Sequence, residues 1–467
     1  MRHSPRQLVS LPKGSGPLHL RLHHKIRSLI LAGSWPPDTR LPSSRDLARD
    51  LGISRNTAIL AIDRLIADGL ARSRPGSGVF VTEAAFAGAA PSASAPEPPV
   101  PFQLAYGGVD LFPTGRWARI QGRVWTGASR NALYEGSGAG FQPLRRAVAA
   151  HLHATRGLCC SAEQVMIVSG TQSAIDLVLR VLGERGDRIW MEDPGHPYVR
   201  QAIDGNGLRS VAVPVDSDGL RVADGIAAAP GARLAYLTPG CQFPTCSILS
   251  EARRLELLDW AEAAGAWIIE DDWDHDARFD GSPPPEPLAA RGSGRILYIQ
   301  SFNRILFPGL RIAALVVPES LVPVLVDARR AIDGFSNIAN QMALAEFIER
   351  GYLASHLRAS RTALAARRAA LHGALARLMP DVVTFDPDQP GLYVVAHPIG
   401  GGDAVLAAEA RRDGFECSAL STFSERGAEA PQGLLLGFAA FQPEVLVRSA
   451  QRLAASLSRA AAAKEVR

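Results

Sequence analysis

Residues 40–69 read RLPSSRDLARDLGISRNTAILAIDRLIADG and decide the character of the N-terminal part of the chain. The pattern predicts two short helices around a tight, glycine-containing turn, with Ser54 as the N-cap of the second helix. Apolar residues fall on one face of this second helix, and its first turn exposes Arg55, Asn56 and Thr57. A recognition helix enters the DNA major groove with such an N-terminal turn. The stretch therefore predicts a helix-turn-helix.

The charge of the chain is unevenly distributed. Residues 1–82 contain 13 Lys and Arg against 5 Asp and Glu, whereas the remaining residues contain 37 against 41. A basic segment attracts the phosphate backbone of nucleic acids. Together with the helix pair, this asymmetry indicates double-stranded DNA as a partner.

The residues predicted to contact DNA surround the helix pair. Side chains in the first turn of the second helix are expected to read bases, and the flanking residues are expected to position the domain on phosphates. These predicted contacts are Arg40, Ser43, Ser44, Arg45, Ser54, Arg55, Asn56, Thr57, Arg74, Gly76, Ser77 and Gly78.

Further elements complete the head of the chain. An amphipathic helix ending at Gly33 precedes the helix pair, and two short strands are expected at Ala71–Arg74 and Val79–Val81, around a Pro-Gly-Ser-Gly turn. Three helices followed by a hairpin form a winged helix, which we assign to residues 17–82. Residues 83–101 are rich in Ala, Pro and Ser, and this composition predicts a linker.

Composition excludes several classes of protein. With 47% hydrophobic and 21% charged residues, the chain is typical of a globular protein. No apolar run approaches the ~18 residues that a membrane-spanning helix needs, and no signal-peptide pattern opens the chain. The five cysteines lack zinc-type spacing, and the acidic cluster at 271–276 is not spaced to converge on an ion. We therefore expect a cytoplasmic protein without membrane contact and without a metal site.

From residue 102 onward, apolar strand patterns alternate with helical patterns. The candidate strands are QVMIVS, DRIWME, ARLAYLT, AWIIED, RILYIQS and IAALVVP. Such alternation is typical of a parallel-rich α/β sheet covered on both faces. We expect a large lobe at about 102–330 and a smaller α+β lobe at about 331–467. The predicted fold class is thus multidomain, with a winged helix-turn-helix followed by an α/β body.

These motifs resemble known families. LPSSRDLARDLGISRNTAI and RPGSGVFV resemble the GntR winged-helix family. SGTQSAIDL, MEDPGHPYVR, TPGCQFPT, IIEDDWD and SFNRILFPGLRIAALVVP resemble, in this order, the fold-type I aminotransferases. Joined by a linker, the two resemble the MocR/GabR class of bacterial transcription regulators over nearly the whole chain. The resemblance implies a head-to-tail homodimer and an effector domain that holds pyridoxal 5'-phosphate or senses an amine or amino acid.

The resemblance also implies the residues of a cofactor or effector pocket. Asp271 would pair with the pyridine nitrogen of the cofactor, and His196 stands where an aromatic residue stacks on its ring. A strand-to-helix turn would offer backbone N–H groups to the phosphate. The implied pocket residues are Gly170, Thr171, Gln172, His196, Asp271, Trp273, Ser301, Arg304 and Arg311.

The chain departs from the aminotransferase pattern at the residue that carries the chemistry. Arg304 occupies the position of the lysine that forms a Schiff base with the cofactor, and no lysine lies between residues 26 and 463. Arginine stays protonated and is a poor nucleophile. Trp273 replaces a tyrosine, and Leu435 stands near the position of the arginine that grips the substrate carboxylate. We therefore expect neither transamination nor covalently bound pyridoxal phosphate.

Two interpretations of Arg304 remain open. In the first, the pocket binds pyridoxal phosphate, or a small anionic or amino-acid-like ligand, non-covalently, and Arg304 contributes a charge-assisted contact. In the second, Arg304 fills the cofactor space, paired with Asp271, and the body is an architectural platform without a ligand. A pyridoxal-phosphate-dependent enzyme that carries a DNA-binding head is the alternative from a different functional class.

Overall fold

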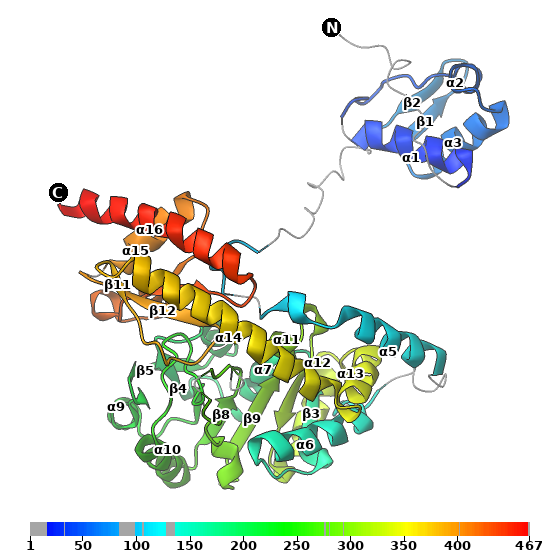
Figure 1. Ribbon diagram of the computed structural model, residues 1–467. Coiled ribbons are helices and arrows are strands. Elements are labelled where there is room, and N and C mark those ends of the chain that lie inside the picture. Colours follow the sequence, from blue (N-terminus) through cyan, green and yellow to red (C-terminus); the bar gives the residue numbers. More distant parts are fainter. Residues whose placement is uncertain are drawn as a thin grey trace. The chain divides into compact units, whose positions relative to one another are not determined.

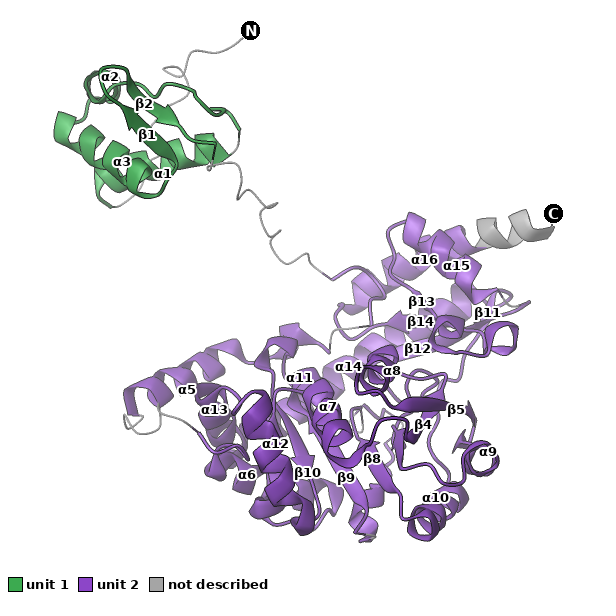
Figure 2. Ribbon diagram, turned by 180° about the vertical axis from the view of Figure 1, so that it is seen from behind, with its two compact units in different colours: residues 1–98 green, residues 99–467 purple. Residues whose placement is uncertain are grey.

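The computed structural model describes residues 16–31, 33–83, 99–104, 107–127, 136–274, 277–279, 281–292, 294–400 and 402–465, with side chains up to Leu457. The chain divides into two compact units, residues 1–98 and 99–467 (Figure 2), which are described separately. Most of the predicted linker lies outside the described residues.

The first unit is a winged helix, as predicted. Its helices and strands are α1 (Leu18–Leu31), α2 (Ser44–Leu51), α3 (Arg55–Ala67), β1 (Ala71–Arg74) and β2 (Gly78–Val81) (Figure 1). The two strands pair antiparallel, and β2 begins one residue earlier than predicted because Gly78 pairs with Arg74. Apolar residues of all three helices and both strands form one core around Trp35 and Leu65.

Side-chain caps define the helix-turn-helix. The Ser43 hydroxyl accepts a hydrogen bond from the Asp46 N–H at 3.2 Å, and the Ser54 hydroxyl accepts one from the Thr57 N–H at 3.1 Å. Gly52 ends α2 at φ +64°, a left-handed conformation that glycine adopts without steric cost. These caps explain why a local sequence pattern was sufficient to predict the element.

The second unit is built on a mixed eight-stranded sheet. Its strands are β3 (Val165–Val168), β4 (Arg188–Asp193), β5 (Arg209–Asp216), β6 (Gly219–Leu220), β7 (Leu234–Leu237), β8 (Trp267–Asp271), β9 (Ile296–Ser301) and β10 (Ala313–Val316). They are ordered β3-β10-β9-β8-β7-β4-β5-β6. Neighbours from β9 to β5 are parallel, whereas β10 is antiparallel to both of its neighbours. Strand β5 was not among the predicted strands, since it contains Pro214 and lies near an edge, where its burial is incomplete.

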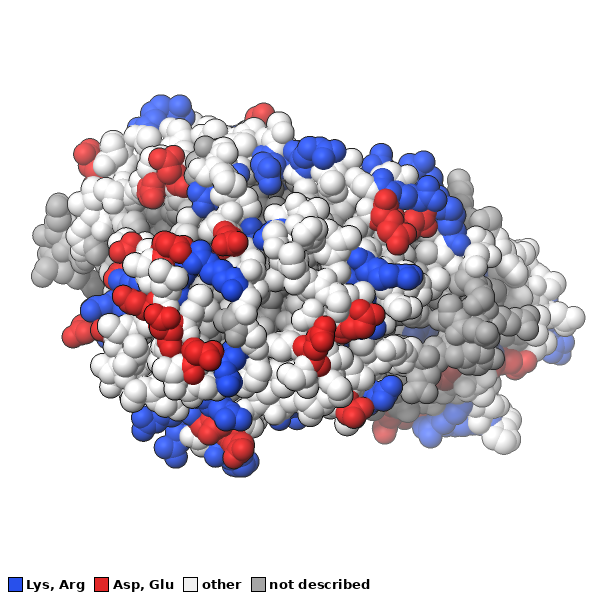
Figure 3. Space-filling model, turned by 90° about the horizontal axis from the view of Figure 1, so that it is seen from below, with Lys and Arg blue, Asp and Glu red and all other residues white. Residues whose placement is uncertain are grey.

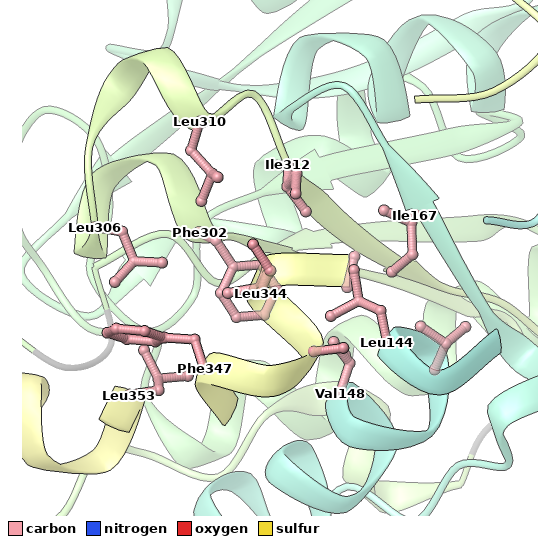
Figure 4. Packing of buried hydrophobic residues seen from close by; sticks show 14 of the residues in the cluster. Leu144, Val148, Ile167, Phe302, Leu306, Leu310, Ile312, Leu344, Phe347 and Leu353 are labelled. Carbon is pink, nitrogen blue, oxygen red and sulfur yellow. The ribbon is translucent and has the colours of Figure 1, made fainter. Parts of the chain in front are cut away.

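Helices cover both faces of this sheet, as the alternation predicted. They are α5 (Thr114–Gly127), α6 (Gln142–Arg156), α7 (Thr171–Leu182), α8 (Pro197–Gly205), α9 (Val222–Ala228), α10 (Glu251–Ala264), α11 (Phe302–Ile305), α12 (Val322–Ile332) and α13 (Ile338–Glu349). Alternate residues of a strand point to opposite faces. Ile167 accordingly belongs to the same buried cluster as Leu144 of α6 and Phe347 of α13 (Figure 4), while Met166 belongs to the cluster with α7 on the other face.

The smaller lobe is α+β, as expected. Its elements are α14 (Tyr352–Leu378), β11 (Val383–Thr384), β12 (Tyr393–Pro398), α15 (Asp403–Arg412), β13 (Ser418–Ala419), β14 (Leu434–Gly437) and α16 (Pro443–Glu465). The strands form an antiparallel sheet in the order β11-β12-β14-β13. Helix α13 shares a buried cluster with α5, α6 and strands of the large sheet. In the described ranges, no helix is long and apolar enough to cross a bilayer.

Candidate DNA-binding surface and effector cavity

The first turn of α3 presents the side chains predicted to read bases. Arg55 and Asn56 are exposed, while Ala58 and Leu65 on the opposite face are fully buried. Thr57 differs from the expectation, because it is half-buried and its hydroxyl shares a 2.8 Å hydrogen bond with the Ser54 hydroxyl. Arg55 and Asn56 are therefore the most accessible of these three side chains.

The wing carries a pairing that the sequence did not reveal. Arg72 donates to the Asp38 carboxylate at 2.9 Å, and Arg74 pairs with the same oxygen while its guanidinium lies 4.5 Å above the Phe80 ring. The hydrogen bond from Arg72 holds the pKa of Asp38 below its usual range. The predicted phosphate contact Arg74 is thus already engaged within the domain.

The other predicted phosphate contacts lie around the same part of the head. Arg40 and Arg45 are exposed, and Arg40 pairs with Phe80 through an isolated β-bridge. The Arg40 Nε lies 3.0 Å from the position that a Cβ on Gly78 would occupy, so Arg40 extends along the wing. Ser43 is exposed and Ser44 half-buried, while Gly76, at φ +73°, and Ser77 form the tip of the hairpin.

Basic residues of the second unit serve a different purpose. Figure 3 shows basic and acidic side chains interspersed over the face that it presents. On α14, the buried Arg367 pairs with Asp110, and Arg368 donates to the Gln389 carbonyl at 2.9 Å. These arginine charges stabilise the fold internally.

A cavity of about 260 Å³ opens where the carboxyl ends of β7, β8 and β9 meet the first turns of α7 and α8. Ligands of open α/β sheets bind at this edge. All the pocket residues implied by the resemblance, except Gly170, line it. The lining is Thr171, Gln172, Ile175, His196, Tyr198, Val199, Tyr236, Thr238, Phe243, Asp271, Trp273, Ser301, Asn303, Arg304, Pro308 and Arg311.

One end of the cavity is suited to an anion. Gly170 precedes α7 at φ +124°, and a Cβ there would lie 3.0 Å from Asn303 Nδ2 and 3.2 Å from Arg311 Nη2. The missing side chain lets both groups approach the helix N-terminus, whose backbone N–H groups attract negative charge. Among the described residues, the exposed Arg311 guanidinium has no hydrogen-bond or ion-pair partner. The Ser301 hydroxyl caps the short helix α11 by accepting from the Asn303 N–H at 3.3 Å.

Asp271 presents an unpaired oxygen to the same cavity. It ends β8 in a buried position, and its Oδ2 accepts a 2.9 Å hydrogen bond from the Tyr236 hydroxyl. Its Oδ1 is buried without a hydrogen-bond partner in the described residues. Burial raises the pKa of Asp271 to about 7. A ligand that brings an N–H group opposite Oδ1 would satisfy this atom.

Arg304 pairs with Asp274 and not with Asp271, which corrects the second interpretation. Its Nε and Nη2 contact the two Asp274 oxygens at 2.5 and 3.1 Å, and the Asp274 side chain is 2% exposed. The guanidinium also lies 4.2 Å above the Trp273 ring. Because Arg304 is held at the wall by these contacts, it leaves the cavity open.

The remaining wall is aromatic. His196 Nδ1 accepts from the Tyr198 N–H at 3.3 Å, and burial together with the Arg304 charge lowers the pKa of His196 to about 4. His196 is therefore a neutral ring near pH 7, and it lies 5.0 Å from the Phe243 ring. Trp273 donates its indole N–H to the Cys241 carbonyl at 2.9 Å.

Sequence reasoning missed several residues of this cavity. Tyr236, Phe243 and Asn303 belong to quoted motifs, but nothing in their local pattern indicated a ligand. Asp274 was considered only as part of an acidic cluster, of which His275 and Asp276 lie outside the described residues. In the ranges that the structure describes, no three His, Cys, Asp or Glu side chains gather to hold a metal ion.

Comparison with known proteins matches both units. The family described as bacterial regulatory proteins, gntR family, matches residues 18–81, and aminotransferase class I and II matches residues 112–400. The probable rhizopine catabolism regulatory protein MocR of Rhizobium meliloti is 35% identical over 92% of both chains. The chain belongs to the MocR-type transcription regulators.

Other similarities of this MocR-type regulator agree with that membership. The pyridoxine biosynthesis transcriptional regulator PdxR of Corynebacterium glutamicum is 29% identical over 95% of both chains. Kynurenine aminotransferase of Pyrococcus horikoshii, solved with PMP, matches with a TM-score of 0.71 over 78% of this chain and 92% of its own, at 24% identity. The latter similarity establishes the aminotransferase fold of the body. The GntR-type head makes the protein a DNA-binding transcription regulator.

Proposed function

We propose that this MocR-type regulator senses a small anionic ligand, pyridoxal phosphate or an amino-acid-like molecule, bound non-covalently in the cavity at the edge of the large sheet. The observation that carries the proposal is that two polar groups without a hydrogen-bond partner line the same open cavity. Asp271 Oδ1 is buried without a partner, and Arg311 offers a free guanidinium. A buried polar atom without a partner is costly, so a complementary ligand stabilises the folded protein.

The residues fit pyridoxal phosphate. Asp271 would hold a protonated ring nitrogen, and Thr171, Ser301 and Arg311, with the N-terminus of α7, would hold the phosphate. His196 and Trp273 would lie along the ring. When bound in enzymes, this cofactor serves as an electron sink. In this chain Arg304, charged and held by Asp274, supplies no amine nucleophile, so we propose a sensor and not a transaminase.

The test uses the full-length protein with pyridoxal phosphate, pyridoxamine phosphate and inorganic phosphate. We expect the first two to raise the unfolding temperature in proportion to the logarithm of their concentration. After borohydride treatment, the intact mass should be unchanged. A mass increase that survives borohydride reduction, and that peptide mapping places on Lys464 and not on Lys13 or Lys25 of the head, would revive the enzyme interpretation. The absence of a temperature shift with any of these compounds would favour the ligand-free platform.

We further propose that the regulator binds double-stranded DNA as a head-to-tail homodimer, with Arg55 and Asn56 reading bases. The exposure of both side chains in the first turn of α3 supports this role. Asn56→Ala should lose about 1–3 kcal/mol of discrimination at one base pair of the operator. Equal losses on operator and random DNA would contradict base reading. Sedimentation equilibrium tests the dimer.

A further inference from the structure

Two buried cysteines meet beside the cavity. Cys241 and Cys246 are 3% and 2% exposed. A Cβ on Gly391 would lie 3.4 Å from Cys241 Sγ and 3.1 Å from Cys246 Sγ, so both sulfur atoms border the same small space. The hydrogen bond between the two thiols, together with burial, raises the pKa of Cys241 well above its usual value. The two thiols are therefore neighbours in a dry environment.

The backbone holds this pair together. The Gln242 N–H donates to the Ser247 carbonyl at 2.8 Å, and the Cys246 N–H donates to the Gln242 carbonyl at 2.7 Å. Cys246 has φ +61°, a left-handed conformation that favours glycine. A disulfide requires close Cβ atoms, and this closed loop brings together two cysteines only five positions apart in the chain.

The pair is coupled to the cavity wall. The Cys241 carbonyl accepts the 2.9 Å hydrogen bond from the Trp273 indole. Phe243, which lies between the cysteines in sequence, packs its ring 5.4 Å from Trp273 and 5.0 Å from His196. These three aromatic side chains line the cavity. A covalent bond between the sulfur atoms would change the loop that positions Phe243 and Trp273.

We propose that Cys241 and Cys246 form a thiol–disulfide site that a peroxide oxidises and that changes the ligand affinity of the cavity, the second part resting on the proposed function. The sulfur of one neutral thiol attacks a peroxide oxygen while its proton passes to the leaving oxygen, the O–O bond breaks, and water leaves. The second thiol then attacks this sulfur, the S–O bond breaks, the S–S bond forms, and a second water leaves. With hydrogen peroxide, two thiols and one peroxide give one disulfide and two waters.

The first test treats full-length protein with hydrogen peroxide, alkylates it after denaturation, and maps its peptides. We expect a disulfide cross-link between Cys241 and Cys246, which dithiothreitol reverses. Cys246→Gly is the matched variant, because glycine suits the φ of +61° and removes only the thiol. Cys159→Ser removes an exposed thiol and should leave the cross-link unchanged. Full alkylation of Cys241 and Cys246 after peroxide treatment would overturn the proposal.

The second test titrates reduced and oxidised protein with pyridoxal phosphate. We expect about a fivefold or larger change in Kd on oxidation, reversed by dithiothreitol and absent in Cys246→Gly. A disulfide with unchanged affinity would refute the coupling to the cavity. If neither form binds any ligand, the proposed sensor function fails while the disulfide itself stands, so the two failures are distinguishable.

Discussion

The two arginines that line the cavity, Arg304 and Arg311, differ in whether they have a partner within the protein. Arg304 has a buried carboxylate partner in Asp274 and a stacking partner in Trp273, whereas the exposed Arg311 has neither a hydrogen bond nor an ion pair among the described residues. A charge that is already paired stabilises the fold, and a charge that is free is available to a ligand. Identical side chains on one cavity thus differ in their availability because their neighbours differ.

The largest effect is expected from removing the partner of Arg304. Asp274→Ala leaves a guanidinium without its carboxylate, and we expect a loss of about 3 kcal/mol in the free energy of unfolding. Urea denaturation measures it. The matched control is Asp327→Ala, which removes an exposed pair with Arg330 and should change stability by less than about 0.5 kcal/mol. Equal losses for the two variants would show that the Arg304–Asp274 pair stabilises the fold no more than an exposed ion pair does.

The second prediction concerns the pH dependence of Asp271. Its pKa is about 7 in the folded protein against 3.8 ordinarily, so the folded state binds more protons and stability falls as pH rises from about 4 to about 7. Asp271→Asn keeps an acceptor for Tyr236 but cannot ionise. Between pH 5 and pH 8, we expect the stability of the variant relative to wild type to increase by roughly 2.5 kcal/mol.

Urea denaturation at several pH values checks this difference. Glu192 and Glu270 also have raised pKa values, near 8 and 7, so only the difference between variant and wild type is diagnostic. A stability difference between variant and wild type that stays constant from pH 5 to pH 8 would contradict the raised pKa of Asp271. Added pyridoxal phosphate should lower the relative stability of the variant at pH 8.

The third prediction tests the free arginine. Arg311→Gln should weaken pyridoxal phosphate binding by about 10-fold or more, because a charge-assisted contact to the phosphate is lost. Since Arg311 has no partner in the described part of the chain, stability without ligand should change by less than about 0.5 kcal/mol. Calorimetric titration and urea denaturation provide the two values. A stability loss as large as that of Asp274→Ala would show that Arg311 is structural.

The fourth prediction, with the smallest expected effect, extends the comparison of free and paired arginines to the DNA-binding head. There Arg45 is exposed, whereas Arg74 is held by Asp38. Arg45→Ala should weaken binding to all DNA sequences similarly and reduce the salt-dependence slope by about one. Affinity measured on operator and random DNA over a range of salt concentrations gives this slope. A loss confined to the operator would assign base reading to Arg45.

Local signals predicted much of the fold. Serine caps, a glycine C-cap and amphipathic periodicity were sufficient for α2 and α3, because these interactions join residues a few positions apart. Buried apolar runs predicted the central strands, because such a run is also a pattern of neighbouring residues. Strand β5 escaped prediction because its burial is uneven and it contains a proline. The packing of α13 against the distant helices α5 and α6 also escaped prediction, because no local pattern indicates which helices meet.

The sequence by itself determined the winged-helix head, the α/β body and the absence of any lysine at the cavity. Only the tertiary structure decided that Arg304 pairs with Asp274, that Asp271 keeps an unpaired oxygen, and that the two thiols meet beside Trp273. The physical reason is the separation along the chain of the residues that interact. Periodicity and capping act over one or two helical turns, whereas ion pairs and cavity walls join residues that the chain separates and only packing brings together.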